Sequence, residues 1–202
     1  SDYVPYVWFD ALINYIPAVG FKEAKDQFDS WWPGSYHLIG KDILTTHAVY
    51  WPTMLLSAGI QLPQSIFAHG WWLMGESKMS KSLGNVINPM DLIDDYGVDP
   101  VRYYLMREMV LGHDSSFTME SFIQRYNSDL ANDFGNLLSR VSTLIKKNYD
   151  ARIPEPGDYL ESDIQIKIKG ESLSSQIEIL IADMRLNEAI EEIMQYIRTV
   201  NK

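Results

Sequence analysis

The chain has 202 residues and a formal net charge of −10 at pH 7, with 46% hydrophobic and 22% charged residues. This composition is typical of a soluble globular protein with one large or two modest domains, and the charge argues against indiscriminate polyanion binding. No apolar run approaches the roughly 18 residues of a membrane span, so we expect no membrane partner. The absence of cysteine excludes disulfides and thiolate metal sites within these residues, and it fits a cytosolic protein.

The first residues predict a strand followed by a helical turn. Residues 3–9 are rich in aromatic and β-branched types, which favours a strand, and residues 10–16 favour a short helical turn that Pro17 interrupts. The chain begins with Ser1 rather than methionine and opens directly into this folded element. We therefore expect a fragment of a longer protein.

A strand, a helix and a second strand are predicted over residues 36–70, the rhythm of a parallel α/β layer. The first strand covers 36–39, the helix runs from 43 to about 57, and the second strand covers 66–70. A strand that leads through Gly40 into a helix N-terminus favours nucleotide binding, because backbone N–H groups face the ligand. Asp42 is placed either to accept hydrogen bonds from a ribose or only to cap the helix, and both roles stay open.

One histidine lies on the apolar face of this predicted helix. Ile43, His47 and Trp51 are spaced four residues apart and share that face. Because most histidines between large apolar residues are satisfied core residues, the spacing alone favours a packing role for His47.

Two lysines follow the second predicted strand in a polar loop. Lys78 and Lys81 stand among Ser77, Ser80 and Ser82. Ammonium groups on long stems suit a polyphosphate whose charge moves, and small hydroxyl residues add donors without blocking approach. From composition alone, a solvated surface loop is an equal alternative.

The second half of the chain is predicted to be helical. Residues 86–118 form a connector, with a short helix from Asn88 and another over 101–109 capped by Asp99. Thr118 is the expected N-cap of a long amphipathic helix that extends to about residue 144. After a linker at 152–157, helices are expected over 160–182 and from Asn187 to 200. Three antiparallel helices would make a bundle.

A polar stripe runs along the long helix, nearly opposite its apolar stripe. It consists of Asn132, Asn136 and Arg140. Between residues 125 and 152 the chain has five basic and three acidic residues, a balance opposite in sign to that of the whole chain. The stripe is either an ordinary solvated face or a partner-binding one.

Several of these segments match motifs of a known family. Lys78-Met79-Ser80-Lys81-Ser82 resembles the signature loop of class I aminoacyl-tRNA synthetases. Residues 7–15, 37–43 and 136–140 are similar to segments of the methionyl-tRNA synthetases of bacterial or organellar type, and the resemblance covers nearly all of the chain. It implies an α/β plus all-α protein with three parts. These are the C-terminal half of a Rossmann-like nucleotide-binding fold (1–85), a connector (86–118) and an anticodon-binding helix bundle (119–202).

The resemblance also implies the site residues. Those carried over for methionine binding are Trp8, Ala11, Leu12, Tyr15, Ile43 and His47. Those carried over for ATP binding are Gly40, Asp42, His69, Gly70, Lys78, Ser80 and Lys81. Lys78 and Lys81 are the expected catalytic residues, and Asn136 and Arg140 the expected anticodon contacts. By this match His47 has a role in the pocket, which overturns the packing role that its spacing favours.

The function implied is ATP-dependent formation of methionyl adenylate and transfer of the methionyl group to a tRNA with a CAU anticodon. ATP would act as substrate with Mg²⁺, and no metal site is expected within the chain. The His-Ile-Gly-His type motif of the family and its inserted connective domain are absent, so we expect these residues alone to be inactive. The alternatives are a class I synthetase for isoleucine, valine, leucine or cysteine, and a non-catalytic tRNA-binding module. We expect a cytoplasmic location, with an organellar matrix still open, and association through the truncated sheet edge.

Overall fold

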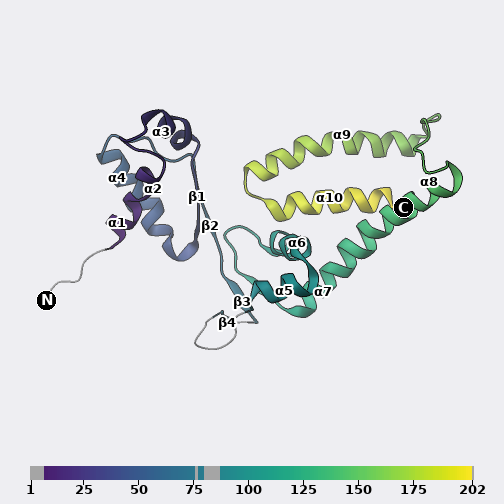
Figure 1. The fold of residues 1–202 in the computed structure, drawn as a ribbon, viewed down its shortest axis with the longest axis horizontal. Helices are drawn as coiled ribbons and strands as arrows, with labels where there is room; N and C mark the ends of the chain where they lie inside the picture. The colour runs from purple at the N-terminus through teal and green to yellow at the C-terminus, as the bar shows by residue number, and fades with distance from the viewer. Residues whose placement is uncertain (1–6, 76, 80–86, 202) are drawn as a thin grey trace. The chain divides into compact units, whose positions relative to one another are not determined.

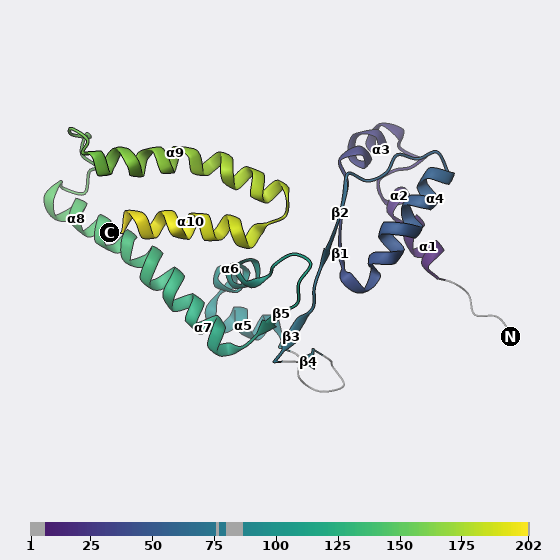
Figure 2. The same ribbon diagram turned by 180° about the vertical axis from the view of Figure 1, so that it is seen from behind.

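The computed structural model describes residues 7–75, 77–79 and 87–201 (Figures 1 and 2). Its contacts divide the chain into two units, Ser1–Trp71 with Leu111–His113, and Trp72–Val110 with Asp114–Lys202. The described parts are mostly helical, with two small sheets that each contain a parallel pair of strands. No helix within them is long and apolar enough to cross a membrane. The division into domains at residues 85 and 118 stays a prediction.

The first unit begins with helices. They are α1 (Trp8–Ile13), α2 (Tyr15–Ala18) and α3 (Lys25–Trp31), followed by the 3₁₀ turn η1 (Trp32–Gly34). The predicted strand is wrong for Trp8 and Phe9, and its residues 3–6 lie outside the described ranges. Helical packing overrides the strand propensity of these residues, because the helical conformation buries both Leu12 and Ile16, which lie one helical turn apart.

Two parallel strands form the sheet of this unit, as the strand–helix–strand pattern predicts. β1 (Tyr36–Gly40) pairs with β2 (Ser65–His69). In this register Gly40 lies opposite His69 at the C-terminal ends of both strands. In parallel sheets, ligands bind at that end.

The predicted helix between the strands has three differently wound segments. A 3₁₀ turn η2 (Lys41–Ile43) leads to a π-helix η3 (Thr46–Tyr50) and then to α4 (Trp51–Ser57). Asp42 as helix N-cap is wrong, because it lies inside η2 and no side chain caps that turn. Single π-helical turns are frequent at functional sites.

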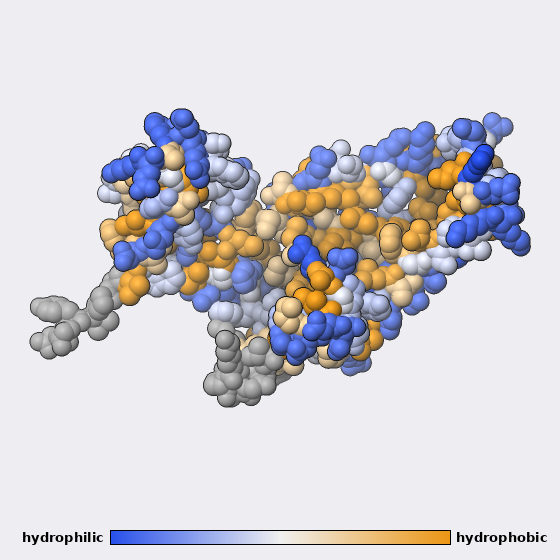
Figure 3. All heavy atoms as spheres, in the orientation of Figure 1, coloured by the Kyte–Doolittle hydropathy of each residue, from blue (hydrophilic) through white to orange (hydrophobic). Residues whose placement is uncertain are grey.

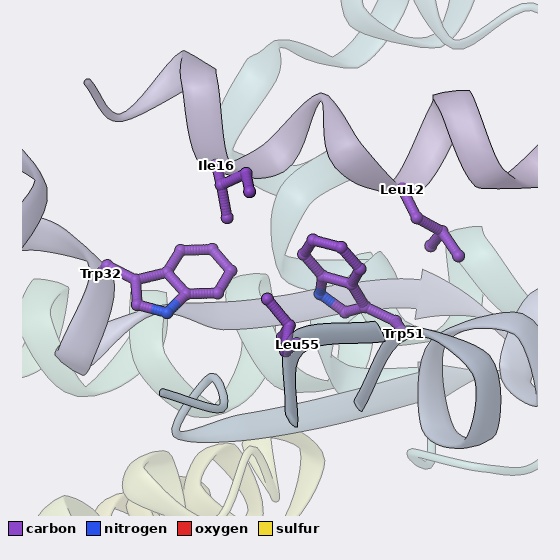
Figure 4. Close-up of a cluster of buried hydrophobic side chains, with 5 residues drawn as sticks. All are labelled: Leu12, Ile16, Trp32, Trp51 and Leu55. Carbon is purple, nitrogen blue, oxygen red and sulfur yellow. The ribbon is translucent and has the colours of Figure 1, made fainter. Parts of the chain in front are cut away.

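A cluster of apolar side chains forms the core of the first unit (Figure 4). Leu12 and Ile16 face Trp51 and Leu55 of α4, and Trp32 closes one side. The Trp32 indole N–H donates to the Gln61 carbonyl oxygen at 2.7 Å, which satisfies its polar atom. Each such buried side chain contributes about 1.5–3 kcal/mol to the free energy of folding, so the cluster fixes α1, α2 and α4 together.

A second sheet and two helices open the second unit. β3 (Trp72–Met74) lies between β4 (Ser77–Lys78), antiparallel to it, and β5 (Ser115–Phe117), parallel to it. Helix α5 (Pro89–Tyr96) starts as predicted, with the Asn88 side chain accepting from the Met90 N–H at 3.1 Å. Helix α6 (Val98–Glu108) starts earlier than predicted, with Gly97 at the N-cap position, so Asp99 lies in its first turn and is not the cap.

The long amphipathic helix is continuous but changes winding along its length. It consists of α7 (Met119–Arg125), the π-helix η5 (Tyr126–Gly135) and α8 (Asn136–Asn148). Thr118 is confirmed as the N-cap, since its hydroxyl accepts from the Ser121 N–H at 3.0 Å. Phe122 is buried, whereas Phe134 on the same predicted apolar stripe is 51% exposed.

Two further helices complete the second unit. α9 (Glu161–Ala182) and α10 (Leu186–Val200) lie side by side, and apolar side chains gather on the face drawn over them (Figures 1 and 3). Arg185 occupies the N-cap position of α10, so Asn187 as the cap is wrong. Gly170 permits the close approach of the two helices, because a Cβ there would lie 2.5 Å from the Tyr196 hydroxyl oxygen.

Candidate active site

Four ring side chains from four elements of the first unit meet in one place. Tyr15 of α2 lies 4.4 Å from His37 of β1, 5.7 Å from His47 of η3 and 5.9 Å from Trp51 of α4, measured between ring centroids. His37, His47 and Trp51 are buried, and Tyr15 is partly exposed. Burial, and to a smaller extent the neighbouring His47, lowers the pKa of His37 below 6.5. His37 therefore adds a neutral ring to this largely apolar group at neutral pH.

His47 is held by hydrogen bonds at both ring nitrogens. Its Nδ1 lies 2.9 Å from the Ile43 carbonyl oxygen, and its Nε2 lies 2.9 Å from the Tyr15 hydroxyl. Since a carbonyl only accepts, Nδ1 carries the proton, Nε2 accepts, and the Tyr15 hydroxyl donates. The Thr46 hydroxyl donates to the same carbonyl at 2.6 Å. His47 is thus a buried and satisfied histidine that fixes the orientation of Tyr15.

The other residues predicted for the amino-acid pocket differ in their surroundings. The Trp8 ring lies 5.9 Å from that of His47, edge to face at 80°. Trp8 and Ile43 are partly exposed, and Ala11 is exposed. Leu12 is 1% exposed within the core cluster. The structure therefore brings Trp8, Tyr15 and His47 together, while Leu12 packs into the core behind them.

The residues predicted for the nucleotide meet at the ends of the parallel strands. A Cβ on Gly40 would lie 2.5 Å from the Asp42 carboxylate oxygen and 3.9 Å from the His69 ring carbon Cε1. Glycine at position 40 therefore leaves room for the Asp42 carboxylate beside the strand end. His69 donates from Nδ1 to the Gly70 carbonyl at 2.8 Å, and Gly70 is buried. Gly40, Asp42 and His69 thus lie together at the strand ends, where parallel sheets bind ligands, and Gly70 is buried directly after them in the chain.

The lysine loop is described only in part. The backbone of Lys78 pairs with Leu73 in the second unit. Ser80 and Lys81 lie outside the described residues. No group of three or more histidine, cysteine, aspartate or glutamate side chains that could hold a metal occurs in the parts of the chain that the structure describes.

Asn136 and Arg140 are exposed in the first turns of α8. They lie four residues apart and therefore on one helix face, as predicted. The π-helix η5 immediately precedes them. This face presents an amide and a guanidinium to the solvent.

A buried charge network that sequence analysis did not find is centred on η5, the segment that immediately precedes this face. Asp129 of η5 is 1% exposed. It accepts hydrogen bonds from the Tyr103 hydroxyl at 2.8 Å and from the Arg198 Nη2 at 3.2 Å. Arg107 Nε and Arg125 Nη1 lie 3.5 and 3.6 Å away as ion pairs. The network ties η5 to α6, α7 and α10, and so supports the helix that carries Asn136 and Arg140.

Three further carboxylates complete the pairing of these arginines. Glu191 pairs with Arg107 and Arg198, Asp133 accepts from the Arg198 Nε at 2.7 Å, and Glu108 pairs with Arg125. The hydrogen bond to Asp133 raises the pKa of the Arg198 guanidinium further. No local sequence signal marks this network, because its paired members are up to 84 residues apart.

Comparison with known proteins decides the family. The family model described as tRNA synthetases class I (M) matches residues 1–142. The chain belongs to this family. The matched residues of this class I tRNA synthetase include the ring group, the strand ends, the lysine loop and the start of α8.

Relatives of this class I synthetase chain cover its whole length. The chain is 45% identical over 201 residues to a methionine–tRNA ligase of Thermotoga maritima and 46% identical over 202 residues to one of Fusobacterium nucleatum. It covers 32% of each, so it spans about a third of the length of these relatives. The structure of the Mycobacterium tuberculosis methionyl-tRNA synthetase in complex with methionyl-adenylate matches 97% of the chain with a TM-score of 0.92 at 42% identity. The chain covers 39% of that structure.

Proposed function

We propose that the whole protein to which this chain belongs is an ATP-dependent methionine–tRNA ligase. The carboxylate of methionine attacks the α-phosphate of ATP, and pyrophosphate leaves. A hydroxyl of the tRNA 3′ end then takes the methionyl group, and AMP leaves. The observation that carries the proposal is the meeting of Trp8, Tyr15 and His47 in a chain 43–46% identical to methionine–tRNA ligases.

The ring group is the methionine site of this proposal. A thioether is apolar, polarizable and a weak hydrogen-bond acceptor, so aromatic walls with one nearby donor select it best. Trp8 and Tyr15 supply sulfur–aromatic contacts, and the hydrogen-bonded pair of Tyr15 and His47 supplies the polar group. Ala11, Leu12 and Ile43 complete the apolar surroundings. Discrimination against an amino acid that differs by one methylene is worth about 1–3 kcal/mol in such a pocket.

In this proposal the strand ends bind the nucleoside part of ATP, and the lysine loop binds its phosphates. Asp42 accepts hydrogen bonds from the ribose, in the room that Gly40 leaves, while His69 and Gly70 lie near the adenine. Lys78, Ser80 and Lys81 hold the pyrophosphate oxygens as negative charge develops there, and no protein nucleophile is needed. Mg²⁺ enters with ATP, bound to the phosphates.

The exposed face of α8 is the tRNA site of this proposal. Asn136 hydrogen-bonds base edges of the CAU anticodon, and Arg140 stacks on or pairs with an unstacked base. The helices from 119 to 202 form the anticodon-binding bundle, and the first unit belongs to the second half of a Rossmann-like nucleotide-binding fold. The absence of cysteine supports a cytoplasmic or matrix location.

Methionine-dependent exchange of pyrophosphate into ATP by the whole protein tests the enzymatic proposal. We expect exchange with methionine and none with valine or isoleucine. Tyr15→Phe removes the hydroxyl that faces His47, and we expect the KM for methionine to rise roughly 2- to 10-fold, the equivalent of one hydrogen bond. Tyr36→Phe, at an exposed tyrosine of β1, is the matched control and leaves the KM unchanged. Exchange driven by isoleucine or valine would assign the protein to another class I synthetase.

Binding of a CAU anticodon stem-loop tests the tRNA proposal separately. We expect Arg140→Ala to weaken binding and Arg152→Ala, at an equally exposed arginine of the linker, to have no effect. Equal weakening by both variants would mean that only general charge attraction is measured. Binding without any exchange activity in the whole protein would favour a non-catalytic tRNA-binding module.

A further inference from the structure

We propose that His37 is a positioning residue of the amino-acid pocket, which fixes the plane of the Tyr15 ring through a close, tilted ring contact and is itself held by Trp51. This inference rests on the proposed function, because it concerns the same methionine site. His37 matches no catalytic or binding position predicted from the sequence. It lies on β1, 7% exposed, and its ring is the nearest of the three rings that contact Tyr15.

The Trp51 contact settles the protonation state of His37. The Trp51 indole N–H lies 3.1 Å from the His37 Nε2, and an indole nitrogen only donates. Nε2 therefore accepts, and the neutral imidazole carries its proton on Nδ1. Burial of His37 also disfavours the charged form. The ring that faces Tyr15 is thus held neutral and at a fixed rotation.

The close contact between the two rings then limits how the Tyr15 ring can tilt. The two ring centroids are 4.4 Å apart with an interplanar angle of 41°. At its far end, Tyr15 must keep its hydroxyl 2.9 Å from the His47 Nε2. Binding sites need side chains held within about 0.5 Å and 10–20° of the productive geometry. His37 holds the Tyr15 ring and His47 holds the Tyr15 hydroxyl. Tyr15 therefore has the orientation that contacts the amino acid before the amino acid binds.

Two substitutions at position 37 separate the two contacts of the imidazole. His37→Gln keeps an acceptor within reach of the Trp51 N–H but removes the ring that packs against Tyr15. His37→Phe keeps a ring face for Tyr15 but leaves the buried Trp51 N–H without a partner. His113→Gln is the control, because it changes an exposed histidine of the same unit.

The assay is methionine-dependent pyrophosphate exchange by the whole protein, with KM measured for methionine and for ATP. We expect His37→Gln to raise the KM for methionine about 10-fold, the equivalent of about 1.4 kcal/mol, with the KM for ATP and the kcat within about 2-fold. We expect His37→Phe to raise it less, and His113→Gln to leave both constants unchanged. If His37 had only a structural role, its substitution would lower the melting temperature or the active fraction of the enzyme without changing the KM for methionine selectively.

A double-mutant cycle tests whether His37 acts through Tyr15. In the background of Tyr15→Ala, we expect His37→Gln to raise the KM for methionine no further, because there is no ring left to position. Additive effects would overturn the proposal, as would an unchanged KM for methionine or an equal rise in the KM for ATP. Failure of both position-37 variants to fold would assign His37 to the core alone and overturn it too. Absence of exchange in the unaltered protein would overturn the proposed function, and this role of His37 with it.

Discussion

Replacing Asp129 by asparagine tests whether the buried charge network holds the second unit together. The substitution keeps the size and shape of the side chain and removes its charge. Asp129 is 1% exposed, and the guanidinium groups of Arg107, Arg125 and Arg198 lie within 3.6 Å of its carboxylate. An amide cannot compensate three buried or half-buried cations.

The expected loss follows from the partners that remain. Removing one member of a buried ion pair costs about 3–5 kcal/mol of the free energy of unfolding, because the other charge is left uncompensated. Each arginine keeps a second carboxylate, Glu191, Glu108 or Asp133. We therefore expect the lower end, about 3 kcal/mol, or a fall in Tm of roughly 6–12 °C for a chain of this size.

Urea unfolding of the 202-residue chain, followed by helical circular dichroism, measures this loss. Asp133→Asn is the matched control. It removes a carboxylate that is 27% exposed and paired with the 37% exposed Arg198, so we expect only about 0.2–1 kcal/mol. Salt at about 1 M should diminish the effect of Asp133→Asn more than that of Asp129→Asn, since buried pairs are screened less. A loss for Asp129→Asn no larger than that of the control would refute the reasoning.

Three further predictions concern single contacts. Gly170→Ala gains up to about 1 kcal/mol of helix propensity, but its Cβ clashes with Tyr196 and forces the helices apart, which costs about 1–3 kcal/mol. We therefore expect a net loss of stability in urea unfolding, and we expect Tyr196→Phe to relieve part of it. Thr118→Ala removes the acceptor for the Ser121 N–H, and we expect it to lower the free energy of unfolding by about 1 kcal/mol; no change in the urea midpoint would contradict the capping role. The third is a pH effect. The folded-state pKa of His37 lies below its unfolded value of 6.5. The contribution of the neutral imidazole to stability is therefore complete above pH 6.5, and it is lost as the pH falls toward the folded-state pKa. His37→Gln should therefore flatten the decline of the urea midpoint between about pH 7.5 and 5.5, and an unchanged slope would count against a neutral buried imidazole.

The parts of the fold that sequence predicted well are those that local chemistry determines. Asn88 and Thr118 were identified as helix starts because their side chains accept from N–H groups two or three residues ahead. The strands predicted at 36–39 and 66–70 from local composition and turn residues were found at 36–40 and 65–69. In these places the local preference and the tertiary packing agree.

The errors occur where packing between distant residues decides. Trp8 and Phe9 favour a strand by composition, yet they lie in α1, whose continuation buries Leu12 and Ile16. The π-helical winding of η3 and η5 leaves no trace in a pattern of three- and four-residue steps. His37 was missed because its importance comes from Tyr15 and Trp51, which lie on other elements.

The wide separation of Asp129 and Arg198 along the chain has a consequence for biosynthesis. Asp129 leaves the ribosome 69 residues before Arg198. At a translation rate of about 5–20 residues per second, roughly 3–14 s pass between the synthesis of Asp129 and that of Arg198. Until then, Arg107 and Arg125, which are made earlier, are the only arginines of the network available to it. The helix that carries Asn136 and Arg140 is therefore synthesised first but reaches its final support only when the last turn of α10 has emerged.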